Sequence, residues 1–259
     1  MSNEYTYGAV VASYDVGPYR DLKLSALLRF QQEAGERQLT SEGYAFGALY
    51  EKGLVFLLSR AASVIHRMPR MGDPVFVTTW FRGTEGASFM RCYTLSGEDG
   101  QLLAESVSAF VVADARTHRI LRPSAFGGME KAAISTRKNS CPDPEKIILE
   151  RMRHTGLVPA ELRSAELPSA GARPIWYSDV DYNGHLNNTV YADFLCDFCP
   201  GGMGDSRVSA FCLNFQGEAL EGDVLSIAAL EEGNRVFYSG EHARGRCFAA
   251  WMERERPVS

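Results

Sequence analysis

The feature of this sequence that most constrains its fold is an internal repeat. Each half of the chain contains a strand-like segment, then an amphipathic helical segment, and then four strand-like segments in succession. When Gly72-Asp73 is laid on Gly222-Asp223, an offset of 150 residues, the strand patterns on either side align as well. A repeat of this kind predicts two copies of one folding unit within a single chain.

The first half has the clearer pattern. A strand is expected over Tyr5–Tyr14, and Asp21 is expected to cap the helix that follows. The apolar residues on one face of this helix, at helical spacing, are Leu24, Leu27, Leu28 and Ala34. Strands are then predicted at Val55–Ile65, Val75–Phe81, Ser88–Leu95 and Leu102–Ala113, with a hairpin turn at 97–100. This succession predicts an antiparallel sheet.

Residues 127–170 are rich in Gly, Pro, Ser and Lys, and they predict a linker with a short helical piece around Ile147–Met152. After the linker the first pattern returns, with a strand over Arg173–Tyr177 and a helix from about Asn188. The apolar face of this helix is expected to contain Tyr191, Phe194, Leu195 and Phe198. The last strands are expected near Val208–Phe215, Asp223–Leu230, Val236–Gly240 and Arg246–Glu253, and the turn at 231–234 is expected to match the turn at 97–100.

The repeat predicts an α+β fold, a double hotdog, in which each of two tandem hotdog domains wraps an antiparallel sheet around a central helix. The expected domains are 1–126 and 171–259, with the linker at 127–170 between them. A chain of 259 residues with 45% hydrophobic content can bury a core in each half.

Charge and the amino-terminal segment limit where such a protein acts. A net charge of −5 and a pI of about 5.6 argue against nucleic-acid binding, which needs a basic surface to replace the counterions of phosphates. The first residues contain no basic segment followed by an apolar core, and no apolar run reaches the roughly 18 residues of a membrane span. We therefore expect a cytoplasmic protein with neither nucleic acid nor membrane as a partner.

The densest group of chemically useful side chains lies in residues 177–191. Asp181 supplies a carboxylate, Asn183 a neutral amide and His185 an imidazole, and the pair Asn187-Asn188 has the residue type of a helix cap. A charged group beside the first residues of a helix predicts an active site, because the helix presents free N–H groups there.

These residues also carry a family resemblance. The run from Asp181 to Tyr191 resembles the signature of hotdog thioesterases, including 4-hydroxybenzoyl-CoA-type enzymes, and Asp181-x-Asn183-x-His185 resembles its acyl-ACP thioesterase form. In the first half, 53–60 and 69–80 resemble the amino-terminal domain of that family. The resemblance covers roughly residues 5–125 and 172–254. It implies release of free fatty acid from acyl carrier protein during fatty acid biosynthesis.

The resemblance implies a further acidic residue, in the strand before the second Gly-Asp turn, and the matching position is Glu218. Many plant members have a cysteine directly after this residue, whereas this chain has Ala219, which argues against a cysteine nucleophile. Plant members usually have Gln at the position of Gly184, while small CoA thioesterases have Gly. The choice between the two carriers therefore stays open.

The chemistry assigns roles to these groups. Asp181 and Glu218 would activate and orient a water, or Asp181 would attack the thioester directly to form an anhydride. Asn183 and His185 would orient the carboxylates or the water. The backbone N–H groups around Asn187, Asn188 and Thr189 are expected to polarise the thioester oxygen, and one such donor typically contributes about 3 kcal/mol to transition-state stabilisation.

The repeat allows the two halves to be compared at this site. At the offset of 150, Glu218 corresponds to Met68, and the segment before the first helix, 16–21, has neither Asn nor His. This asymmetry predicts a catalytic C-terminal half and an N-terminal half that mainly binds the acyl chain.

Other interpretations account for the same residues. Asp181, the Asn183-Gly184 dipeptide and Asn187 would suit an ordinary turn followed by a helix cap. An acyl-CoA thioesterase, a non-catalytic acyl-binding or regulatory module, and a hotdog dehydratase or hydratase are the alternative functions. Cys196 and Cys199 have redox or metal spacing, but structural thiols are expected because no second ligand pair completes a zinc site. The other histidines, expected at the surface, are His66, His118, His154 and His242.

No metal or organic cofactor is expected. The predicted partner is acyl carrier protein with its acyl-phosphopantetheine, and homodimerisation is the assembly considered.

Overall fold

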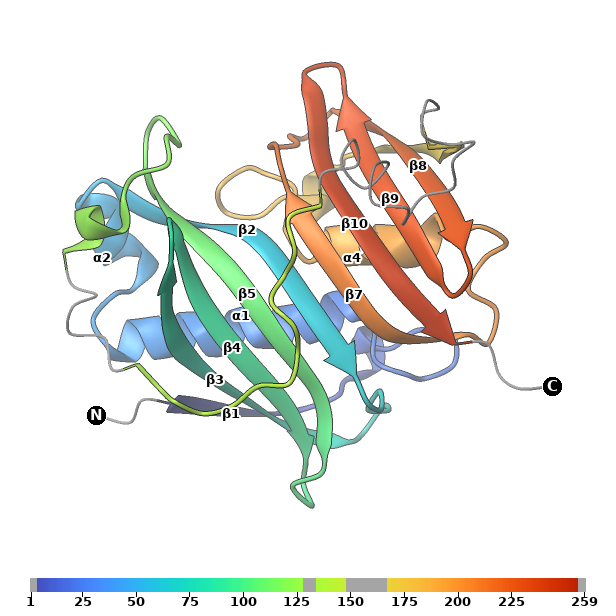
Figure 1. Ribbon diagram of the computed structural model, residues 1–259, viewed down its shortest axis with the longest axis horizontal. Helices are drawn as coiled ribbons and strands as arrows, with labels where there is room; N and C mark the ends of the chain where they lie inside the picture. The colour runs from blue at the N-terminus through green and yellow to red at the C-terminus, as the bar shows by residue number, and fades with distance from the viewer. Residues whose placement is uncertain (1–3, 128–133, 148–166, 256–259) are drawn as a thin grey trace. The chain divides into compact units, whose positions relative to one another are not determined.

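The computed structural model describes residues 4–127, 134–147 and 167–255. The chain forms two compact units, Met1–Pro144 (unit 1) and Glu145–Ser259 (unit 2). In each unit a five-stranded antiparallel sheet carries a helix across one face (Figure 1). The α+β double hotdog prediction is therefore confirmed.

Unit 1 begins with β1 (Glu4–Val10), and its main helix α1 (Leu24–Ser41) is followed by the short α2 (Phe46–Glu51). Its other strands are β2 (Leu54–Ile65), β3 (Pro74–Glu85), β4 (Ser88–Gly97) and β5 (Leu102–Asp114). The order across the sheet is β1-β3-β4-β5-β2, and all pairs are antiparallel. Helix α1 buries Leu24, Leu27, Leu28 and Ala34, as its spacing predicted.

Unit 2 repeats this topology with β6 (Ser169–Pro174) and, among its described residues, one α-helix, α4 (Val190–Asp197). The remaining strands are β7 (Arg207–Phe215), β8 (Val224–Glu232), β9 (Arg235–His242) and β10 (Gly245–Glu255). Their order, β6-β8-β9-β10-β7, is that of unit 1 with each strand replaced by its counterpart.

The position of α4 is fixed by contacts with the sheet beneath it. The ring of Tyr191 lies 5.3 Å from that of Phe215 on β7 and 5.2 Å from that of Phe248 on β10. The Tyr238 hydroxyl on β9 donates to the carbonyl oxygen of Leu195 at 2.7 Å. These contacts hold the first turn of α4, and with it the segment 177–189, in place over the sheet.

Hydrogen bonds confirm that the two units are copies of one fold. The N–H of Leu22 donates to the Pro69 carbonyl in unit 1 (2.9 Å), and the N–H of Leu186 donates to the Ala219 carbonyl in unit 2 (2.8 Å). Strands β2 and β3 correspond to β7 and β8 at an offset of 150 residues, whereas the segments before the helices correspond at 164, because the helices and the loops after them differ in length.

Two local predictions were wrong. Asp21 does not cap α1, which begins at Leu24 with Lys23 as its N-cap; the Asp21 carboxylate instead forms an ion pair with Arg70 (3.4 Å). The turn at 231–234 joins β8 to β9, so the counterpart of the β4–β5 turn at 97–100 is the β9–β10 turn near 242–245. Both β-to-β turns have similar composition, and composition alone does not distinguish them.

The described part of the expected linker is bound to the units. In unit 1 the side-chain amide of Asn139 donates to the carbonyl oxygens of Tyr93 and Ser106 (3.1 and 3.0 Å). In unit 2 the N–H of Ile147 donates to Asn214 Oδ1 at 2.8 Å. The helical piece expected to continue to residue 152, and His154, lie outside the described residues. None of the helices in the described ranges is long and apolar enough to cross a membrane.

Candidate active site

The predicted polar cluster begins in a tight turn over 181–185. The N–H of Gly184 donates to the carbonyl oxygen of Asp181 (2.9 Å), and the N–H of Asp181 donates to that of His185 (2.8 Å). Asp181 Oδ1 accepts the N–H of Asn183 at 2.8 Å. Gly184 has a φ of 78°, a conformation that favours glycine. The turn leaves Asp181 half-buried and the Asn183 side chain exposed.

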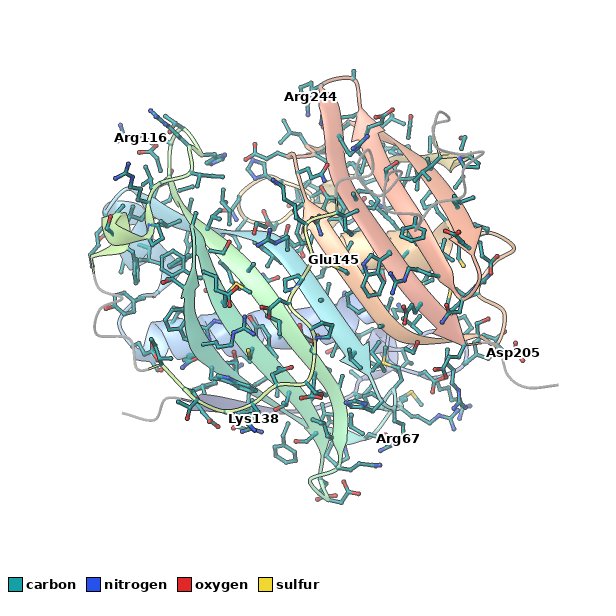
Figure 2. All side chains as sticks on the ribbon, viewed as in Figure 1. Arg67, Arg116, Lys138, Glu145, Asp205 and Arg244 are labelled. Atoms are coloured by element: carbon teal, nitrogen blue, oxygen red, sulfur yellow. The ribbon has the colours of Figure 1, made fainter. Side chains whose placement is uncertain are left out.

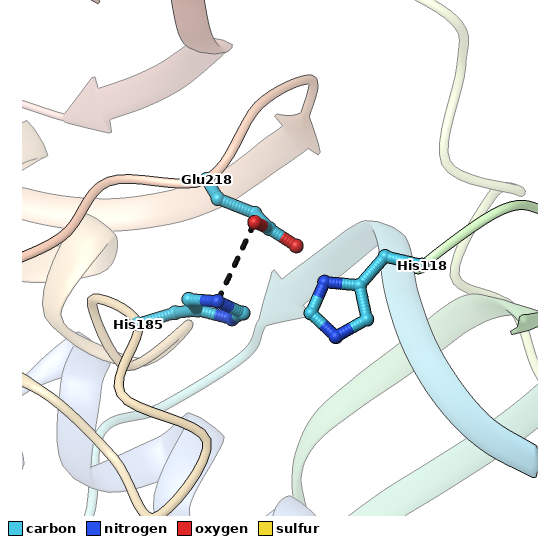
Figure 3. A group of neighbouring side chains, drawn as sticks. All are labelled: His118, His185 and Glu218. Atoms are coloured by element: carbon cyan, nitrogen blue, oxygen red, sulfur yellow. Dashed lines mark ion pairs between the residues drawn. The ribbon is translucent and has the colours of Figure 1, made fainter. Parts of the chain in front are cut away.

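The imidazole that closes this turn faces the predicted acidic residue. His185 Nε2 lies 3.4 Å from Glu218 Oε2 (Figure 3), and His185 pairs through its backbone with Leu220. Only 21% of the His185 side chain is exposed, against 46% for Glu218, so the carboxylate is the more solvent-exposed group of the pair. The structure thus joins residues 33 positions apart in the sequence.

Asp179, which the sequence analysis missed, anchors the turn from within. Its Oδ2 accepts the N–H of Trp176 (3.0 Å), and its Oδ1 accepts from Arg173 Nη2 (2.8 Å). Its carbonyl oxygen accepts the N–H of Asn187 at 2.9 Å. One buried residue therefore fixes both ends of the segment that holds Asp181 and His185.

The repeat contained a signal for Asp179. The dipeptide Asp-Val occurs at 15–16 and again at 179–180, at the offset of 164. Asp15 is also buried and accepts the N–H of Ala12 at 3.1 Å. A residue that both copies keep while the polar set changes is expected to serve the fold.

Glu218 was expected on a strand, but it lies in the loop between β7 and β8, which backbone hydrogen bonds hold in place. The N–H groups of Gln216 and Gly217 both donate to the carbonyl oxygen of Cys247, at 2.7 and 3.1 Å. A Cβ atom on Gly217 would lie 2.8 Å from the carbonyl oxygen of Arg246, so the loop approaches β10 more closely than a side chain permits.

Gly217→Ala is expected to lower the free energy of unfolding by about 1 to 3 kcal/mol, because the added methyl group must displace backbone. Urea denaturation checks the value. The matched control is Gly47→Ala in α2, where a Cβ meets nothing within 4 Å and the helix gains about 0.5 to 1 kcal/mol. Equal effects of the two substitutions would contradict the close approach at Gly217.

The three amides expected to polarise the thioester differ in availability. The Asn187 N–H donates to Asp179, and the N–H of Thr189 donates to Asn187 Oδ1 at 2.9 Å. Among the residues that the structure describes, the Asn188 N–H has no hydrogen-bond acceptor. Asn188 is therefore the available donor in front of α4.

Three of the four thiols of unit 2 are poor nucleophiles. Burial raises the pKa of Cys247 to about 11 and that of Cys196 to about 12, and it also raises the pKa of Cys199. All three are free thiols that stay protonated near neutral pH. The expected burial is confirmed, because Cys199 is buried and Cys196 is half-buried.

The same turn in unit 1 lacks the polar set. The N–H of Gly17 donates to the carbonyl oxygen of Asp21 and that of Arg20 to Gly17, both at 3.0 Å, as in the turn of unit 2. The counterparts of Asp181, Asn183, His185 and Glu218 are Gly17, Tyr19, Asp21 and Met68. The two turns thus share a backbone conformation but differ in the side chains that are expected to take part in catalysis.

Comparison with known proteins gives matches to both units. Residues 2–124 match the family of acyl-ACP thioesterase N-terminal domains, and residues 169–245 match that of acyl-ACP thioesterase C-terminal domains. The second match includes Asp181, His185 and Glu218.

Curated relatives are named as acyl carrier protein thioesterases or hydrolases. A chloroplastic palmitoyl-acyl carrier protein thioesterase of Gossypium hirsutum is 26% identical over 86% of this chain and 54% of its own length. A chloroplastic dodecanoyl-[acyl-carrier-protein] hydrolase of Umbellularia californica is 27% identical over 83% of this chain and 56% of its own. The chain thus spans about half the length of the curated relatives it matches.

Solved structures share the fold. An acyl-ACP thioesterase from Bacteroides thetaiotaomicron has a TM-score of 0.83 at 20% identity, covering 98% of this chain and 100% of that one. The 12:0-ACP thioesterase from Umbellularia californica has a TM-score of 0.78 at 19% identity, covering 98% of both chains. With both of its units matched by the two domain families, the chain belongs to the acyl-ACP thioesterase family.

Proposed function

We propose that this protein is a fatty acyl-ACP thioesterase, which hydrolyses the thioester between a fatty acyl chain and the phosphopantetheine arm of acyl carrier protein. The observation that carries the proposal is the His185–Glu218 pair beside the Asp181 turn, within the residues that match the C-terminal domain family. The names of the relatives support the same reaction.

In the proposed reaction a water molecule attacks the thioester carbonyl carbon. Asp181 or Glu218 takes the proton of that water, and His185 and Asn183 orient the two carboxylates. The Asn188 N–H, helped by the α4 dipole, stabilises the oxyanion. The C–S bond then breaks, and the thiol leaves with a proton while the fatty acid is released. Direct attack by Asp181 to form an anhydride is the alternative first step.

The conformation of Gly184 bears on the choice of carrier. Glycine at this position was the reason to consider acyl-CoA, but its φ of 78° accounts for the glycine through the turn itself. Arg20, its counterpart in unit 1, has a φ of 64°, so the turn favours glycine without requiring it. We therefore retain acyl carrier protein as the proposed carrier.

We propose that the two domains have different roles, with the boundaries expected from the sequence. The C-terminal domain, 171–259, is assigned catalysis, and the N-terminal domain, 1–126, is assigned acyl-chain binding. Support comes from Gly17 and Met68, which leave the unit 1 turn without an acid or base at these positions. A cytoplasmic location and a homodimer complete the proposal; sedimentation of the purified protein tests the second.

Wild-type protein supplied with a series of acyl-ACP substrates is expected to release free fatty acid and free carrier thiol in equal amounts. Because each buried methylene contributes only about 0.8 kcal/mol, kcat/KM should change about fourfold per methylene until a wall stops longer chains. Mass spectrometry of the products, with matched acyl-CoA in parallel, measures both.

Different outcomes exclude different proposals. A higher kcat/KM on acyl-CoA would overturn the choice of carrier. Binding without turnover would favour the non-catalytic module, and an enoyl product from a 3-hydroxyacyl substrate would favour the dehydratase.

A further inference from the structure

His242, expected at the surface, is enclosed. It stands at the end of β9, and only 7% of its side chain is exposed. Its Nε2 atom lies 3.0 Å from the carbonyl oxygen of Glu218, and its Nδ1 atom lies 3.1 Å from the backbone nitrogen of Arg244. The surface prediction was wrong for this residue because spacing in the sequence does not reveal which loop folds over a hairpin.

These two contacts determine where the ring carries its proton. The backbone N–H of Arg244 can only donate, so Nδ1 of His242 accepts and has no proton. Nε2 then carries the proton and donates it to the carbonyl oxygen of Glu218. The imidazole therefore acts as a neutral bridge between the β9–β10 hairpin and the Glu218 loop.

Asp223 and Arg244 hold this bridge. Asp223 accepts from the N–H of Leu220 (2.7 Å) and from Arg244 Nη1 (2.9 Å), and its Oδ2 lies 3.7 Å from His242 Nε2. The bond from Arg244, which lies at the hairpin in Figure 2, keeps the pKa of the Asp223 carboxyl below its usual value. The carboxylate thus ties the end of the Glu218 loop to the hairpin.

The copy of the fold in unit 1 lacks the bridge. The Ser226–Glu241 pair of β8 and β9 corresponds to the Phe76–Ser96 pair of β3 and β4, so the next residue, His242, corresponds to Gly97. Gly97 has no side chain to donate, and the position of Glu218 is Met68. Unit 2 therefore has both the imidazole and the acid at these two positions, and unit 1 has neither.

We propose that His242 is a positioning residue for Glu218: its Nε2–H fixes the Glu218 carbonyl and so keeps the carboxylate directed at His185. The inference rests on the proposed function, since it assigns His242 no chemistry of its own. Its contribution is orientational, and a misplacement of about 1 Å at a reacting group can cost on the order of 100-fold in rate.

Two conservative substitutions separate the two ring nitrogens. His242→Gln places an amide N–H near the former Nε2 and retains the donor to Glu218, so kcat on the preferred acyl-ACP should stay within about threefold of wild type. His242→Asn retains an acceptor near the former Nδ1 but loses that donor, so kcat should fall about 10- to 100-fold with KM unchanged. Glu241→Gln, an exposed neighbour, is the control for the hairpin and should leave kcat unchanged.

A double-mutant cycle with Glu218→Gln tests whether the effect passes through Glu218. His242→Asn should lower kcat further by less than about twofold in a protein that already lacks the carboxylate. NMR of the ring nitrogens in wild-type protein should report the Nε2–H tautomer at neutral pH, a readout independent of turnover.

Each contrary result has a distinct meaning. Full activity of His242→Asn, equal losses in the Gln and Asn variants, or additive losses with Glu218→Gln would overturn the positioning role alone. Full activity of Glu218→Gln itself would overturn the role of Glu218 in the proposed function, and this inference with it.

Discussion

Asp181→Asn is expected to lower kcat/KM for acyl-ACP by about 100- to 10,000-fold, the usual contribution of a positioned acid or base. Asparagine keeps the Oδ1 atom that accepts the Asn183 N–H, so the turn should form while the charge is lost. Glu218→Gln should cause a loss of the same order, because it also removes a carboxylate with little change in shape. Single-turnover rates on acyl-ACP measure both.

Glu221→Gln is the matched control for these two variants. Glu221 lies three residues from Glu218 in the same loop and is exposed, so the same change of charge should leave kcat/KM within about twofold. Circular dichroism of all three variants should match wild type. Wild-type rates in both Asp181→Asn and Glu218→Gln would refute the proposed site.

Asp179→Ala is expected to have the largest effect on stability among substitutions near the turn, a loss of about 2 to 4 kcal/mol in the free energy of unfolding. The change removes the acceptor for Trp176 N–H and leaves Arg173 without its partner. Arg173 is 28% exposed, which places the loss below that of a fully buried ion pair. Urea denaturation gives the magnitude, and hydrogen exchange over 175–190 should locate it in unit 2.

The same substitution in unit 1 provides the comparison. Asp15 accepts the N–H of Ala12, but its ionic partner Arg29 is 3.7 Å away and 44% exposed. Asp15→Ala should therefore lose only about 1 to 2 kcal/mol. A loss at Asp15 equal to or greater than that at Asp179 would show that the ion pair with Arg173 contributes nothing.

The sequence was most informative where a regular period recurs. Strand and helix positions in both units follow apolar spacing, and the offset of 150 identifies Met68 as the counterpart of Glu218 from the sequence alone. The backbone of the turn is also local, because its hydrogen bonds join residues no more than four positions apart in 181–185. Local patterns therefore predicted the fold and the group of polar residues.

Such patterns do not predict contacts between distant segments of the chain. His242 meets Glu218 across 24 positions, through a hairpin whose turn was matched to the wrong counterpart. The availability of the Asn188 amide depends on Asp179 and Asn187 accepting from its neighbours, which composition does not show. Residues that hold a site in place do so through tertiary contacts, which the sequence does not show directly. They are therefore harder to predict than the residues that react.

The two offsets, 164 before the helices and 150 in the two strands that follow them, record where the copies diverged in length. Fourteen residues were gained or lost between the start of the helix and the second strand, and the paired backbone bonds of Leu22 and Leu186 survived this change. Most of this difference lies in the helix, which has 18 residues in α1 and 8 in α4, and the rest lies in the connection to the second strand, 198–206 in unit 2. The length of this connection is thus weakly constrained, and a fluorescent label at the exposed Asp205 should be tolerated.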